Sequence, residues 1–103
     1  MERELFERLV ALATDLAREQ HYESTYHALM AALHLADCMR DQEAVDRVGD
    51  RASEAGDAVE AVRPPHPLSR RRADERGQTS VFDSLRVHVD AVRLRLKGVE
   101  MAR

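Results

Sequence analysis

Apolar side chains recur at helical spacing in four separate runs of this 103-residue chain. In residues 2–20 the leucines are three or four positions apart, which is the spacing of one face of an α-helix. This leucine stripe consists of Leu5, Leu9, Leu12 and Leu16, with Phe6, Val10, Ala13 and Ala17 beside it. Residues 22–39 are the most apolar run, and their broad apolar arc predicts a central helix that contacts more than one neighbour.

Residues 42–62 carry a narrower seam of small side chains, at alternating steps of three and four. Gly49 and Gly56 interrupt it, and each weakens a helix by about 1 kcal/mol relative to alanine, so tertiary packing must supply the difference. The apolar stripe of residues 22–39, carried forward, falls on charged positions, which places a short turn near residue 40. Asp41 is the expected N-cap of the third helix. The seam consists of Val45, Val48, Ala52, Ala55, Val59 and Val62.

The segment 63–79 breaks the helical pattern. Its Arg63-Pro64-Pro65-His66-Pro67 sequence forbids a regular helix, although Ser69 to Arg76 could form a short one closed by Gly77. A capping box at Ser80 to Asp83 starts the last helix, and Gly98 indicates an end near residue 97. We therefore predict an all-α fold, with residues 1–103 forming a single domain. It is a compact antiparallel bundle of about four helices (2–20, 22–39, 42–62 and 80–97), with a Pro/Arg-rich loop before the last helix.

Large and small residues alternate along residues 9–37 in a recognisable order: Leu9, Leu12, Ala13 and Leu16, then Thr25, Leu29 and Ala32. In this the segment resembles one tetratricopeptide-type helical hairpin, although Asp37 stands where that family usually has proline. The resemblance implies a helical hairpin used as a binding scaffold. A plain antiparallel helix pair needs the same small residues, and it is the alternative that we favour.

Composition narrows the class of protein further. Cys38 is the only cysteine, so no intrachain disulfide can form, and the N-terminus is charged from its second residue. We expect a cytoplasmic protein without a membrane segment. Residues 1–62 hold fourteen acidic against six basic side chains, and residues 63–103 hold ten basic against five acidic. We expect the basic last helix to pair with the acidic helices before it.

One polar stripe of the second helix holds side chains that can bind metal. Glu23, His27, His34 and Cys38 share one face, and His34 with Cys38 has the i, i+4 spacing of a two-residue chelate. The alternatives are an ordinary exposed polar face, which we favour, and a nucleophilic Cys38 activated by His34, for which no orienting third group is visible.

Arg70, Arg71 and Arg72 form a basic cluster that could bind phosphate groups or an acidic partner. Nucleic acid is the less favoured partner, because interleaved aromatics and a helix-turn-helix signature are missing and Lys97 is the only lysine. No glycine-rich phosphate loop or catalytic triad is present, so we expect neither a cofactor nor enzymatic activity. The leading interpretation is a non-enzymatic protein-interaction or adaptor module whose partners include a second copy of itself. The alternative is a bundle that binds metal or a small ligand through His27, His34 and Cys38.

Overall fold

Five α-helices make up the structure, a computed structural model that describes residues 1–101, with side chains described through Gly98. The described residues contain no strand, and the all-α prediction is confirmed. The short helix that the segment 69–76 could form is present as α4. The bounds are α1 (Glu2–Arg18), α2 (Tyr22–Met39), α3 (Gln42–Glu60), α4 (Arg70–Glu75) and α5 (Val81–Met101).

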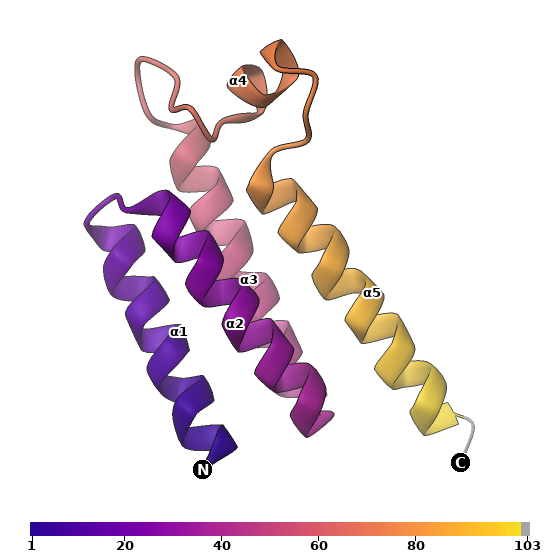
Figure 1. Cartoon of the computed structure of the whole chain (residues 1–103). Coiled ribbons are helices and arrows are strands. Elements are labelled where there is room, and N and C mark those ends of the chain that lie inside the picture. The colour runs from indigo at the N-terminus through magenta and orange to yellow at the C-terminus, as the bar shows by residue number, and fades with distance from the viewer. Residues whose placement is uncertain (102–103) are drawn as a thin grey trace.

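The four long helices run alternately up and down (Figure 1), so the predicted antiparallel arrangement is confirmed. Helices α2 and α3 lie in the centre. α1 packs mainly against α2, and α5 packs against α3 and, less extensively, α2. The Cα trace measures 49 × 27 × 16 Å, and α4 lies beyond the end at which α3 finishes and α5 begins. Each outer helix therefore has one covered side and one open side.

The core is built from all four long helices. Its largest fully buried apolar side chains are Phe6, Leu29, Val45, Val48, Val59, Phe82, Leu85 and Val89. In α1 the buried positions are Phe6, Val10 and Ala13, whereas Leu5 and Leu12 are 47% and 50% exposed. The leucine stripe therefore lies at the margin of the core, because α1 is covered mainly by one neighbour.

The helix boundaries follow the expected local chemistry at two points. Arg40 adopts a left-handed conformation (φ 53°) that ends α2, and Asp41 Oδ1 accepts a hydrogen bond from the Ala44 N–H at 3.1 Å. The turn near residue 40 and the Asp41 N-cap are therefore confirmed. Gly77, with φ +67°, follows α4 as predicted.

The last helix differs from its prediction at both ends. Ser80 Oγ accepts from the Asp83 N–H at 3.2 Å, which confirms the hydroxyl half of the capping box, but the Asp83 carboxylate accepts from Arg70 and Arg86. The predicted end near residue 97 was wrong, because α5 continues through Gly98 to Met101. A glycine marks a helix end when it takes a positive φ, as Gly77 does and Gly98 does not. Within residues 1–101, no helix is both long and apolar enough to span a membrane.

Candidate functional site

The predicted metal ligands lie on the outer face of α2. Glu23, His27, His34 and Cys38 are all exposed, on the side of the helix opposite its buried residues. Within the described part of the chain, no three His, Cys, Asp or Glu side chains are close enough together to hold an ion. His34 and Cys38 share a face, but the fold brings no third ligand to them.

His34 shares a groove with a histidine from another helix, which sequence spacing could not indicate. It lines a shallow groove between α2 and α5 together with His88, and Asp37 forms an ion pair with Arg95 in the same groove. The rest of the groove is apolar, since it is lined by Met30, Leu33, Ala91 and Val92. The groove thus has an apolar floor, two imidazoles and an ion pair that is already formed.

The predicted basic cluster is engaged in ion pairs. Arg70 donates to both oxygens of Asp83, with Nε and Nη2 each 2.8 Å from an oxygen, and its backbone N–H donates to Glu60 at 2.9 Å. Arg71 and Arg72 lie 3.8 Å and 3.4 Å from the Glu75 carboxylate. The hydrogen bonds from Arg70 hold the pKa of Asp83 below its ordinary value. These ion pairs neutralise part of the positive charge with which the arginines would attract a phosphate group.

Ion pairs also join the basic α5 to the acidic helices, as expected from the uneven charge distribution. Arg93 Nε lies 2.6 Å from Asp46 Oδ1, Arg86 Nη2 lies 3.7 Å from Asp57 Oδ1, and Arg95 pairs with Asp37. The first two link α5 to α3, and the third links α5 to α2. Three of the basic side chains of α5 are therefore paired with acidic side chains of the preceding helices.

Arg47 of α3 holds α1 in place. Its Nη1 and Nη2 donate to the two Glu7 oxygens at 2.5 and 2.8 Å, and its guanidinium carbon lies 5.3 Å from the centre of the Phe6 ring. The bond from Arg47 lowers the pKa of Glu7. Nearer the end of the bundle, Arg3 pairs with the Asp41 carboxylate. These contacts join α1 to α3 in an orientation that leaves Leu5 and Leu12 of the leucine stripe half exposed.

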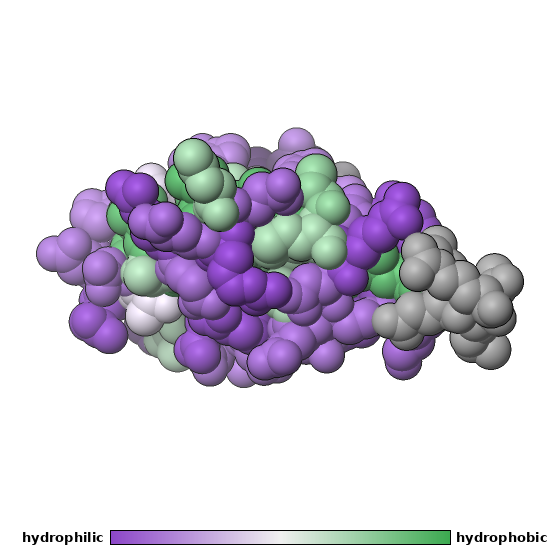
Figure 2. Space-filling view, turned by 90° about the horizontal axis from the view of Figure 1, so that it is seen from below, coloured by the Kyte–Doolittle hydropathy of each residue, from purple (hydrophilic) through white to green (hydrophobic). Residues whose placement is uncertain are grey.

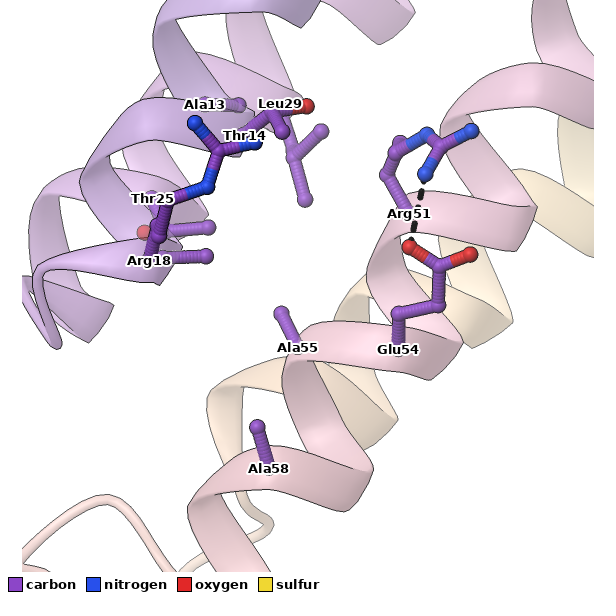
Figure 3. Close-up of a pocket in the computed structure, with 10 residues that line it drawn as sticks. Ala13, Thr14, Arg18, Thr25, Leu29, Arg51, Glu54, Ala55 and Ala58 are labelled. Atoms are coloured by element: carbon purple, nitrogen blue, oxygen red, sulfur yellow. Dashed lines mark hydrogen bonds and ion pairs between the residues drawn. The ribbon is translucent and has the colours of Figure 1, made fainter.

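A hollow of about 300 Å³ lies between α1, α2 and α3 (Figure 3). Small side chains such as Ala13, Ala55 and Ala58 leave it unfilled, Arg18 points toward it, and an Arg51–Glu54 ion pair lies at its edge. Thr25 lines it too, but its hydroxyl donates to the His21 carbonyl at 2.8 Å. The hollow is open and mainly apolar, with its buried hydroxyl already satisfied.

Large apolar side chains are exposed on both outer helices. They are Leu5 and Leu12 on α1 and Val87 and Leu94 on α5, the last two 68% and 71% exposed. Viewed from the end where α1 begins, the surface is mostly hydrophilic and is broken by separate hydrophobic areas (Figure 2). Sequence periodicity placed the leucines on one face of α1, but the packing decides that this face is only half covered.

Comparisons with known proteins identify no relative: no family model, curated protein or solved structure matches the chain. The resemblance of residues 9–37 to a tetratricopeptide-type hairpin stays a prediction.

Proposed function

We propose that this protein is a non-enzymatic helical interaction module and that one of its partners is a second copy of itself. The observation that carries the proposal is the half-exposed leucine stripe of α1, in which Leu5 and Leu12 are about half accessible. Exposed leucines at heptad spacing are typical of a surface that packs against another helix.

The energetics support the proposal. Fully burying a leucine side chain contributes about 1.5–3 kcal/mol, so covering a half-exposed one contributes roughly half of that. Leu9 and Leu16 already pack against the core along one side, and a partner helix would also cover their open sides. Over two copies, covering Leu5 and Leu12 contributes only about 3–6 kcal/mol, and association itself has an entropic cost, so the contact suits a weak, reversible association between modules.

The shape of the molecule supports it as well. The Cα trace is only 16 Å across its shortest dimension, and the outer helices have neighbours mainly on one side. A small domain of this kind buries little area for each residue, and association is a common way to bury more.

Sedimentation velocity over a concentration series tests the proposal. The expected result is a shift from monomer to dimer between about 10 µM and 1 mM, the range of a weak association. A monomer at every concentration would contradict self-association.

A further inference from the structure

The leucine stripe of α1 is self-complementary in an antiparallel arrangement. Its steps of four, three and four are symmetric about the point between residues 10 and 11. If a second α1 ran in the opposite direction about a two-fold axis at that point, Leu5 would meet the partner's Leu16, and Leu9 would meet the partner's Leu12. All four leucines of each copy would then lie in matched layers, as an isologous interface requires.

The charges beside the stripe fit the same arrangement. Arg8 and Asp15 are exposed on the open flank of α1, and they stand at corresponding heptad positions. In the antiparallel pairing, Arg8 lies beside the partner's Asp15, and the two-fold axis repeats this pair. In a parallel pairing, Arg8 would lie beside the partner's residue five positions later in the heptad, which is Ala13, so Arg8 and Asp15 would not meet and only the antiparallel orientation pairs them.

We infer that α1 binds α1 of a second copy in antiparallel orientation, with the leucine stripe as the contact and two Arg8–Asp15 pairs at its edges. This inference rests on the proposed self-association and names the surface responsible. Glu2 and Glu19 border the stripe and would face one another between the copies, which limits the contact to the four leucine layers. The contact is therefore short.

The exposed side of α5 is a poorer candidate for the same role. Val87, Ala91 and Leu94 share one face there, but only alanine lies at the centre of that row. A two-fold axis that pairs Val87 with the partner's Leu94 falls between residues 90 and 91, so its centre would hold Asp90 and Ala91 and no large apolar side chain. Leu94 is nevertheless a large exposed leucine, which makes it a suitable control.

The matched variants Leu12→Asp and Leu94→Asp separate the two surfaces in sedimentation velocity. Leu12→Asp changes the two central layers at once and is expected to weaken the dimer by more than about tenfold, while Leu94→Asp leaves it unchanged. Circular dichroism should show the same helix content in both. A dimer that survives Leu12→Asp would overturn the inference while leaving self-association intact. A wild-type chain that stays monomeric would overturn both.

A charge exchange tests the orientation without touching the apolar contact. Arg8→Asp alone and Asp15→Arg alone each place like charges together, and each should weaken self-association. An equimolar mixture of the two variants restores opposite charges on both edges, so heterodimers should form at wild-type concentrations. If each variant dimerises as the wild type does, or if the mixture fails to associate, the antiparallel pairing is wrong.

Discussion

Arg86 of α5 lies directly over Gly56 of α3, in the space that a side chain at position 56 would occupy. A Cβ atom there would also lie 3.3 Å from Phe82 Cβ. The pattern repeats one heptad away, where Arg93 Nη2 lies 2.9 Å from the place of a Cβ atom on Gly49. The two glycines thus allow α5 to approach α3 closely, and Arg86 and Arg93 cross the contact to reach Asp57 and Asp46.

Gly56→Ala should therefore destabilise the protein, although alanine is the better helix former. Replacing glycine by alanine stabilises the helix itself by about 1 kcal/mol, whereas crowding in a packed contact typically costs about 1–3 kcal/mol. The free energy of unfolding should therefore fall by about 1 kcal/mol. Urea unfolding measures the change.

Gly98→Ala is the control for that experiment. A Cβ atom on Gly98 meets nothing within 4 Å, and α5 continues past this residue. The substitution should stabilise the protein by about 0.5–1 kcal/mol. Equal effects at positions 56 and 98 would mean that Gly56 has no packing role.

Leu29 lies at the centre of the core on α2 and is fully buried. Leu29→Ala should lower the free energy of unfolding by about 2–5 kcal/mol, because it removes apolar contacts and leaves a cavity. Leu94→Ala removes the same atoms from an exposed position and should change it by no more than about 0.5 kcal/mol. Thermal melts of both variants measure this difference. A similar loss of stability in the two variants would contradict the placement of Leu29 in the core and Leu94 on the surface.

The sequence predicted the positions of the helices better than it predicted which of their faces are buried. Asp41 and Gly77 act locally, through one hydrogen bond and one backbone angle, so the turns at these residues could be read directly. Which side of α1 is most deeply buried depends on how many helices pack against it. The spacing of Leu5, Leu9 and Leu12 shows that they share a face, but it does not show how many helices cover that face. Local signals therefore predict where the helices begin and end, but not how deeply each face of α1 is buried.

The candidate sites could likewise be predicted only in part, because their partners come from other segments of the chain. His34 was identified from its neighbours on α2, whereas His88, which lines the same groove, comes from another helix. Arg70 was recognised as basic, but its partner Asp83 becomes a neighbour only because the loop folds back onto the start of α5. Contacts between distant segments depend on packing that no local pattern records.

Asp83 should make stability depend on pH. Its folded-state pKa is lowered, chiefly by the hydrogen bonds from Arg70, so protons bind the unfolded state more readily. The contribution is present above the ordinary carboxyl pKa and is lost as the pH falls through the lower folded value. Asp83→Asn should cost up to about 1 kcal/mol at pH 7, and the difference from wild type should shrink below about pH 4.

Urea titrations at pH 7 and at progressively lower pH measure that difference. Asp50→Asn, at an exposed position of α3, is the matched control and should leave the pH dependence unchanged. A constant gap between wild type and Asp83→Asn at all pH values would show that the Arg70–Asp83 pair does not produce the effect.

Metal should have no influence on stability. His27, His34 and Cys38 are exposed on α2, and no three potential ligands among the described residues lie close enough together to hold an ion. A specifically bound ion at a hundred times its Kd would stabilise the fold by about 2.7 kcal/mol. Thermal melts with Zn²⁺ and with a chelator should coincide. A stabilisation by Zn²⁺ that His34→Ala abolishes would instead establish a metal site.

Distances between spin labels on α1 test the central claim most directly. In a Cys38→Ser background, a label at Ala11 is level with the proposed two-fold axis, so the two labels should be separated only across the helix pair: by the roughly 10 Å between helix axes plus the reach of two side chains that point away from the contact. A label at Arg18 should be separated by about 22 Å along the helix axis in addition, at 1.5 Å for each residue. A short distance at Ala11 and a long one at Arg18 is the predicted result. Equal distances at the two positions, or no dipolar coupling at either, would contradict it.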